Sequence, residues 1–218
     1  MREASGNATA IEFWYEFASP YAYVAASRIE GLAAGKPLRI DWRPFLLGPI
    51  FKARPHDSSP YQNPSPAQRR YRWRDVQRLC HGAGLPLRTP SAYPRNALIA
   101  ARVALIAIDE GWGPDFTRAA YRANFAEDRE IGDEAVIGAV IAELGRDAGP
   151  VLAHAQSPAN KARLFAQGEA AVARGIFGAP SMLVGGELFW GNDRLEQAIA
   201  WALASPDLPP LPQAGRLA

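Results

Sequence analysis

The chain has 218 residues, of which 48% are hydrophobic and 21% charged, a composition typical of a globular protein with a sizeable core. Its formal net charge of +2 is too small to indicate binding to nucleic acid or to an anionic membrane surface. The single cysteine, Cys80, excludes an intramolecular disulfide and a Cys-x-x-Cys redox centre. The sequence shows neither a signal peptide nor a membrane span, so we expect a cytoplasmic protein.

The first part of the chain predicts a strand, a helix and a second strand. Residues 11–15 are mostly β-branched and aromatic, which is typical of a buried strand. Ser19 and Pro20 suit the N-cap and the first position of a helix that we expect over residues 19–34. Residues 38–45 alternate between apolar and polar side chains and predict a second strand. Together these elements indicate a right-handed parallel βαβ unit.

The middle of the chain predicts a long loop followed by helices only. Residues 46–66 are rich in Pro and Ser, and we expect a functional or mobile loop there. The next half of the chain has helical periodicity and no convincing strand. Helices are expected over residues 67–82, 95–110, 114–126, 133–144 and 157–174.

The end of the chain predicts a hairpin and a last helix. Strands are expected over residues 181–184 and 187–190, joined by a glycine turn. Asn192 or Asp193 can cap a helix over residues 193–203. The order βαβ, helical block, ββα predicts an α/β, thioredoxin-like fold with an all-helical insertion. The thioredoxin-like domain is expected to comprise residues 10–64 and 175–204, the insertion 65–174 and an irregular tail 205–218.

Ser19 has two possible roles. A plain helix N-cap would account for this serine. Its side chain would also lie beside unpaired backbone N–H groups at the positive end of the helix dipole, a place that stabilises an anion. Thioredoxin-like proteins carry their reactive sulfur there. Because this chain has a serine instead, any sulfur chemistry requires a thiol from another molecule.

Pro180 follows a helix and precedes the hairpin. In this layout we expect a cis Ala179–Pro180 bond, although most X–Pro bonds are trans. A cis bond would turn the backbone of Ala179 outward and leave its N–H and C=O available to pair with a bound peptide.

Four segments together resemble the 2-hydroxychromene-2-carboxylate isomerases, relatives of the kappa-class glutathione transferases in the DsbA-like branch of the thioredoxin fold. They are FWYEFASPYAYVAA, PFLLGPIFKA, GIFGAPSMLV and FWGNDRLEQA, and the resemblance covers about residues 10–204. It implies a glutathione cofactor and a homodimer.

The resemblance also implies site residues. The Ser19 hydroxyl would bind the glutathione sulfur, and the Ala179–Pro180 backbone its cysteinyl part. Asn192 and Asp193 would bind the γ-glutamyl end, and Asp75 would act from the helical insertion, often across the dimer. Asp193 could instead be a helix cap, and Asp75 an intrahelical partner of nearby arginines. Gln68 stands where relatives carry a lysine for the glycyl carboxylate.

The implied reaction converts 2-hydroxychromene-2-carboxylate to trans-o-hydroxybenzylidenepyruvate, by reversible thiolate addition, in aromatic compound breakdown. The substrate is an aromatic acid, so Lys52 could bind its carboxylate while Phe51, Trp14 or Trp190 pack on its ring. Alternatives are a kappa-type glutathione transferase or peroxidase and a non-catalytic binding module. The histidines show no ligand spacing, and no metal site is expected.

Overall fold

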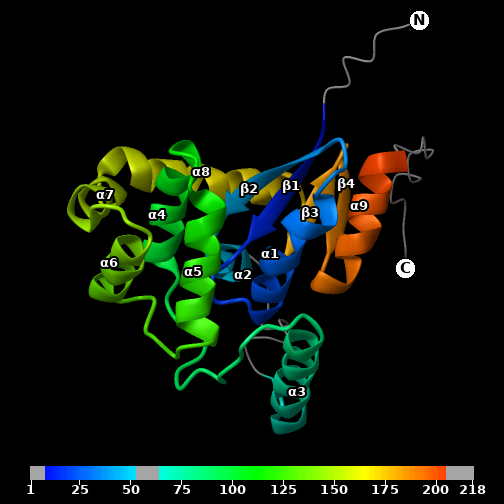
Figure 1. Cartoon of the computed structure of the whole chain (residues 1–218), viewed down its shortest axis with the longest axis horizontal. Coiled ribbons are helices and arrows are strands. Elements are labelled where there is room, and N and C mark those ends of the chain that lie inside the picture. Colours follow the sequence, from blue (N-terminus) through cyan, green and yellow to red (C-terminus); the bar gives the residue numbers. More distant parts are fainter. Residues whose placement is uncertain (1–7, 53–63, 205–218) are drawn as a thin grey trace, which may run out of the picture.

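The centre of the molecule is a four-stranded sheet, seen here in a computed structural model that describes residues 8–52 and 64–204 (Figure 1). β1 (Thr9–Tyr15) pairs in parallel with β2 (Leu38–Pro44). It pairs on its other side with the antiparallel β3 (Ser181–Val184), and β3 pairs with β4 (Glu187–Trp190). The strand order β2-β1-β3-β4 confirms the expected βαβ–ββα arrangement. The expected tail lies outside the described residues.

Side chains of β1 alternate between two apolar layers, as the twofold period of a strand requires. Ile11, Phe13 and Tyr15 are fully buried in the main core, which includes α1 (Pro20–Ala33) and the central helices. Trp14 points to the other face and packs in a small cluster with Phe45. Because the main core joins sheet and helical insertion in one cluster, the division into two domains stays a prediction.

The helical part lies between β2 and β3, and Figure 1 shows most of it gathered at one side of the sheet. Its helices are α2 (Leu47–Lys52), α3 (Pro66–Gly82), α4 (Leu98–Asp109), α5 (Gly113–Phe125), α6 (Glu134–Glu143), α7 (Ala148–Ala155) and α8 (Pro158–Ala173). The sequence did not predict α2 or α7. Each carries a Gly-Pro pair near its start, and such a pair normally indicates the end of a helix. Proline is tolerated there because the first N–H groups of a helix have no intrahelical partner. The remainder of the predicted loop, residues 53–63, lies outside the described residues.

The hairpin turn is as expected. Gly185 and Gly186 have φ values of 58° and 95°, which only glycine adopts readily. The chain then makes a short 3-10 turn, η1 (Asn192–Arg194), before α9 (Leu195–Ala204). The expected side-chain cap is wrong, because Gly191 occupies the N-cap position and Asn192 and Asp193 lie inside the turn.

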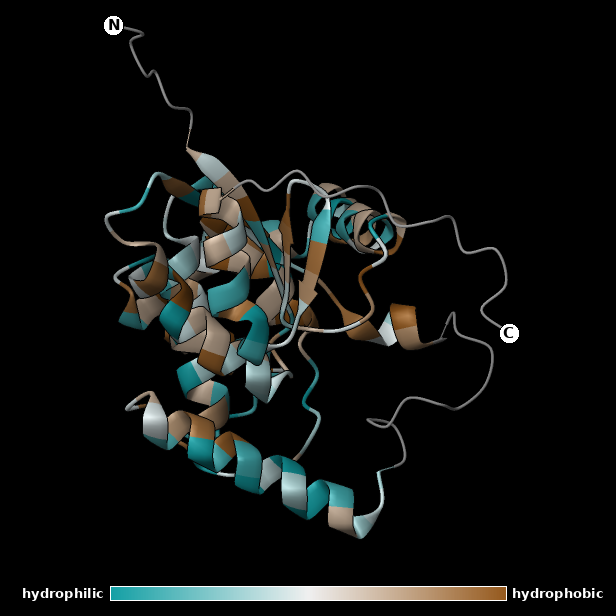
Figure 2. Cartoon of the chain, turned by 90° about the vertical axis from the view of Figure 1, so that its right-hand side faces the viewer, coloured by the Kyte–Doolittle hydropathy of each residue, from teal (hydrophilic) through white to brown (hydrophobic). Residues whose placement is uncertain are grey.

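α3 stands apart from the other helices and is largely hydrophilic (Figure 2). It begins with a capping box, in which Ser65 and Gln68 each bond the other's backbone N–H. Cys80, near its end, is buried in the core as expected from the sequence. Within the described ranges, no helix has the length and hydropathy needed to cross a membrane.

Candidate active site

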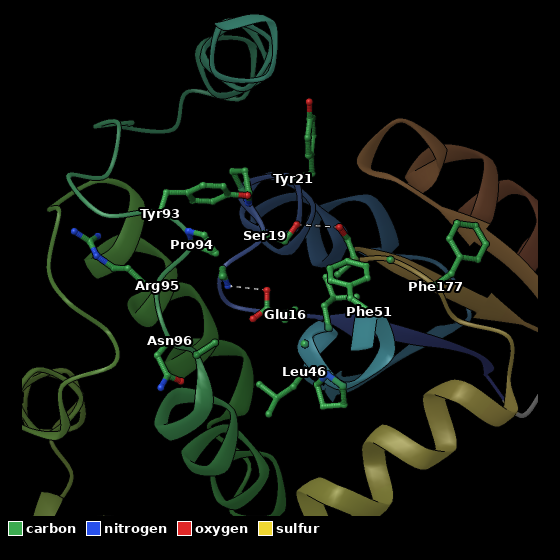
Figure 3. A pocket seen from close by; sticks show the side chains of 18 of the residues that line it. Glu16, Ser19, Tyr21, Leu46, Phe51, Tyr93, Pro94, Arg95, Asn96 and Phe177 are labelled. Carbon is green, nitrogen blue, oxygen red and sulfur yellow. Dashed lines mark hydrogen bonds between the residues drawn. The ribbon is translucent and has the colours of Figure 1, made fainter. Parts of the chain in front are cut away.

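Ser19 is the N-cap of α1 and also faces a cavity. Its extended backbone places Oγ 3.2 Å from the N–H of Ala22, and Pro20 occupies the first helical turn. The same oxygen donates a hydrogen bond to the Ala179 carbonyl at 2.9 Å (Figure 3). Both roles weighed for this serine are therefore compatible: it caps the helix and lies at a cavity wall.

The Ala179–Pro180 bond is cis, as predicted. One part of the expectation is corrected, because the Ala179 carbonyl is not left free but accepts the hydroxyl of Ser19. The carbonyl of Pro180 accepts the N–H of Gly191 at 2.9 Å. This backbone step is therefore held from two sides, by the start of α1 and by the end of β4.

The cavity has a volume of about 590 Å³, within the usual range of roughly 300–1,000 Å³ for small-molecule sites. Five parts of the chain form it: the turn before α1 with the start of that helix, the helix α2, the segment before α4, the segment before β3 and the end of β4 (Figure 3). Most of its lining is apolar or aromatic. Ala179, Ser19, Phe51 and Trp190, all proposed from the sequence, lie together here.

An aromatic pair forms the wall near β4. The rings of Phe177 and Trp190 meet edge to face at 4.9 Å, and Trp190 is 42% exposed. Gly178 lies directly under the indole, since a Cβ at this position would be 2.3 Å from Trp190 Nε1. The glycine is thus required by close approach of a side chain.

Trp14 is not part of the cavity, which corrects the expectation that it packs on a substrate ring. Its indole N–H donates to Glu12 Oε2 at 2.9 Å, and the guanidinium of Arg174 lies over its ring. It is 1% exposed. Because Trp14 lies on the opposite face of β1 from Phe13 and Tyr15, it fills the small apolar layer under α8.

Asp75 is connected to the cavity wall by a hydrogen bond from the side chain of Tyr21. The hydroxyl of Tyr21, which lines the cavity, donates to Asp75 Oδ2 at 3.1 Å. Arg78 donates to its other oxygen, also at 3.1 Å. The intrahelical arginine partner is therefore present, and the Tyr21 contact links Asp75 to the cavity lining, while its part in binding glutathione stays a prediction.

Asn192 and Asp193 lie outside the cavity lining, in η1 just beyond Trp190. Asn192 is buried, and its Oδ1 accepts a hydrogen bond from Arg28 at 3.0 Å. Asp193 is exposed and pairs with the neighbouring Arg194 at 3.0 Å. Lys52 is the last residue of α2, and its side chain lies outside the described part of the structure.

Glu16 is a residue of the cavity that sequence reasoning missed. It is 7% exposed and lies on the same turn as Ser19. Its Oε2 accepts the N–H of Ala18 at 3.0 Å. Burial raises the pKa of this carboxyl to about 8, against the smaller opposite effect of the Ala18 N–H. An acid inside a motif dominated by aromatic residues was the available signal.

Arg95 also lines the cavity, but its guanidinium group is already bonded to other residues of the protein. Its side chain is 2% exposed, and both terminal nitrogens bond to oxygens of Asn124 or Asp128. Its Nε lies 3.3 Å from Glu130 Oε2. Arg95 therefore holds the segment before α4 against the end of α5. No group of three or more potential metal ligands occurs among residues 8–52 and 64–204.

Residues 10–200 match the family model of the DSBA-like thioredoxin domain. The chain is 27% identical over 186 residues to a 2-hydroxychromene-2-carboxylate isomerase of Sphingobium xenophagum, covering 85% of this chain and 94% of the relative. It is 28% identical over 185 residues to the enzyme of the same name from Pseudomonas putida, covering 85% and 90%.

Solved structures agree with these matches. A 2-hydroxychromene-2-carboxylate isomerase superposes with a TM-score of 0.76 at 27% identity, covering 88% of this chain and 93% of the other. A probable DsbA oxidoreductase from Streptomyces coelicolor superposes with a TM-score of 0.74 at 24% identity, covering 94% of both chains, and supports the fold alone. The chain therefore belongs to the DSBA-like thioredoxin domain family, and it is similar over most of its length to 2-hydroxychromene-2-carboxylate isomerases.

Proposed function

We propose that this protein is an isomerase that interconverts 2-hydroxychromene-2-carboxylate and trans-o-hydroxybenzylidenepyruvate with glutathione as cofactor. One observation carries the proposal: the Ser19 hydroxyl, at the N-terminus of α1, lies at the wall of an apolar cavity beside the cis Ala179–Pro180 step. Likeness to proteins named as isomerases of this substrate supports the reaction.

The residues present fit a thiol cofactor. A serine hydroxyl carries one hydrogen that rotates to suit its acceptor, so Ser19 can turn its hydrogen from the Ala179 carbonyl to a sulfur atom. The N–H groups at the start of α1 add positive partial charge at the same place. Glutathione bound there would supply a thiolate as nucleophile. Ser19 stabilises that charge, and the Ala179 backbone is the partner for the cysteinyl part.

A serine at this position also separates the proposal from disulfide exchange. Ser19 donates a hydrogen bond to sulfur but forms no mixed disulfide. The single cysteine of the chain, Cys80, is 1% exposed, and burial raises the pKa of its thiol to about 11. Since the thiolate is the reactive form, this cysteine is unsuited to redox chemistry.

The ends of the tripeptide are assigned to residues beyond the cavity lining. Asp193 is exposed, which leaves it accessible to the γ-glutamyl ammonium group. Asn192 is its neighbour in η1, where the Arg28 contact to Oδ1 leaves the amide N–H groups as donors. Asp75 acts through the hydroxyl of Tyr21.

The substrate would occupy the apolar part of the cavity. Phe51 on α2, Phe177 before β3 and Trp190 on β4 provide faces for its aromatic ring. Lys52 follows Phe51 directly and is the cation proposed for its carboxylate. In this proposal, one wall of the cavity binds the thiol of glutathione and another packs on the aromatic ring of the substrate.

The test is a rate assay with and without glutathione on two substrates. Turnover of 2-hydroxychromene-2-carboxylate only in the presence of glutathione supports the proposal. Preference for chlorodinitrobenzene would indicate a transferase instead, and inactivity on both would indicate a binding module. Ser157→Ala is the matched control for Ser19→Ala, because both serines precede a proline and cap a helix with an oxygen 3.2 Å from a backbone N–H. Only the Ser19 variant should lose turnover.

A further inference from the structure

We propose that Glu16 is a catalytic acid–base residue that moves a proton between the two oxygens of the substrate's hemiketal carbon. This assignment rests on the proposed function, since it needs that substrate. It concerns ring opening rather than the double bond. The observation behind it is a carboxyl group inside the cavity that the thiol chemistry does not use.

The position of the Glu16 carboxyl is fixed by the turn that carries Ser19. The carbonyl of Glu16 accepts the N–H of Ser19 at 3.0 Å and the hydroxyl of Tyr121 at 3.0 Å. Its Oε2 is held by the N–H of Ala18. Figure 3 shows the carboxyl group pointing into the space between Phe51 and Asn96. Such fixed placement is what proton transfer to a bound ligand requires.

The surroundings favour the neutral form of this carboxyl at neutral pH. Among the described residues, Glu16 forms no ion pair. Its ionisable neighbours are Tyr15 on β1 and Tyr121 on α5, both buried with a raised pKa. The Arg95 guanidinium on the segment before α4 is bonded to Asn124 and Asp128. Burial raises the pKa of Glu16 to about 8, close to the working range of an acid–base catalyst.

The proton transfer balances without any other reactant. Neutral Glu16 donates its proton to the ring oxygen as the bond from that oxygen to C2 breaks, and the bonding electron pair stays on the oxygen as a phenol. The electron pair of the C2 hydroxyl O–H bond becomes the second bond of the ketone carbonyl. The released proton returns to the Glu16 carboxylate. The reverse sequence closes the ring.

A purely structural role is the alternative, because the Ala18 contact alone would explain an acceptor at this position. Glu16→Gln separates the two readings, since the glutamine carbonyl oxygen still accepts the Ala18 N–H but the side chain cannot exchange a proton. Glu12→Gln is the matched control: Glu12 lies on β1 outside the cavity, bound to Trp14 and Arg174.

Two readouts are needed. The first is kcat with saturating substrate and glutathione as a function of pH. Glu16→Gln should lower kcat by roughly 10²–10⁴-fold, the usual contribution of a positioned acid or base, and should lose the alkaline limb of the pH profile. The second is the infrared carbonyl band of a protonated carboxylic acid. It should titrate at about pH 8 in the wild type and in Glu12→Gln, be absent in Glu16→Gln, and shift when 2H-chromene-2-carboxylate binds.

The outcomes separate this assignment from the proposed function. Equal kcat for Glu16→Gln and Glu12→Gln, or a Glu16 band that does not shift with the bound chromene, overturns the role of Glu16 alone. A wild-type protein that does not turn over the chromene, yet shows the band shift, contradicts the proposed function while supporting a proton-donating contact from Glu16 to this ligand class.

Discussion

The hydroxyl of Ser19 donates a hydrogen bond to the carbonyl of Ala179 at 2.9 Å, across 160 positions of sequence. The contact joins the N-terminus of α1 to the cis-proline step before β3. A bound thiol would compete for this hydrogen, because a hydroxyl has only one to give. Binding of a thiol at Ser19 would therefore require one rotation of this hydroxyl.

Ser19→Ala should lower stability by the sum of two small terms and also remove a specific function. Losing an N-cap serine costs about 1 kcal/mol of unfolding free energy, and the lost bond to Ala179 adds about 1 kcal/mol. Ser157→Ala, at the start of α8, should lose only the cap contribution. Denaturant unfolding of both variants measures the difference. Equal losses would show that the Ala179 contact contributes nothing to the fold.

Glu16→Gln should stabilise the protein in alkaline solution. Below about pH 4.5 the carboxyl is protonated in both the folded and the unfolded state. Between that value and the folded-state pKa of about 8 only the unfolded state ionises, so stability falls as pH rises through this window. The variant should gain a few kcal/mol above pH 8 and nothing in acid. Unfolding at several pH values checks this, and a gain that does not vary with pH would contradict it. Glu12→Gln lacks the gain because Arg174 and Trp14 bind that carboxylate.

Gly178→Ala should displace the aromatic wall of the cavity. Its new Cβ would lie 2.3 Å from Trp190 Nε1 and 2.9 Å from Cε2, so the indole must move. We expect a destabilisation of about 1–3 kcal/mol, typical of overpacking, and weaker binding of aromatic acids. Gly168→Ala, on α8 with nothing within 4 Å, should instead stabilise by about 0.5–1 kcal/mol. A changed Trp fluorescence in Gly178→Ala alone supports the contact; unchanged fluorescence there counts against it.

Asp193→Asn tests the γ-glutamyl end of the proposed glutathione site. Because Asp193 is exposed and does not occupy the N-cap position, which is Gly191, the change should leave stability near that of the wild type. Affinity for glutathione should fall by roughly 1.5–3 kcal/mol, the scale of a hydrogen bond to a charged group. Asp115→Asn is the control, since Asp115 is likewise exposed, in a first helical turn and paired with an arginine. Equal calorimetric affinities in all three proteins would leave Asp193 without a role in binding.

The homodimer implied by the family resemblance stays a prediction. Two aromatic side chains of the helical part are unusually exposed, Tyr71 on α3 at 64% and Phe165 on α8 at 72%. Exposed aromatic residues of this kind favour association. Sedimentation equilibrium at micromolar concentration should give twice the mass of one chain, and a mass of one chain would contradict the expectation.

Local signals in the sequence predicted the elements that hold the site. The Ser-Pro start of α1 and the double glycine of the hairpin each demand one local geometry, and both were read correctly. The cis bond at Pro180 followed from its place between helix and hairpin. α2 and α7 were missed because a Gly-Pro pair that fits a first helical turn looks like a helix breaker.

Sequence reasoning failed where long-range packing decides. Trp14 was assigned to the cavity, but no residue of β1 lines it, and the indole packs instead against Phe45 in the small cluster under α8. The burial of Glu16 comes from the turn before α1 folding against Tyr121, about a hundred residues away. The 3-10 turn at Asn192 is held by Arg28 on α1, and no local sequence pattern predicts this contact.

The central claim is that Ser19 and the N-terminus of α1 hold an ionised thiol at the cavity wall. Ultraviolet thiolate absorbance of the glutathione complex, titrated with pH in the wild type, Ser19→Ala and Ser157→Ala, tests it most directly. Loss of a charge-assisted hydrogen bond should raise the bound thiol pKa by roughly one to two units in Ser19→Ala and leave it unchanged in Ser157→Ala. Superimposable titrations in all three proteins would contradict the claim.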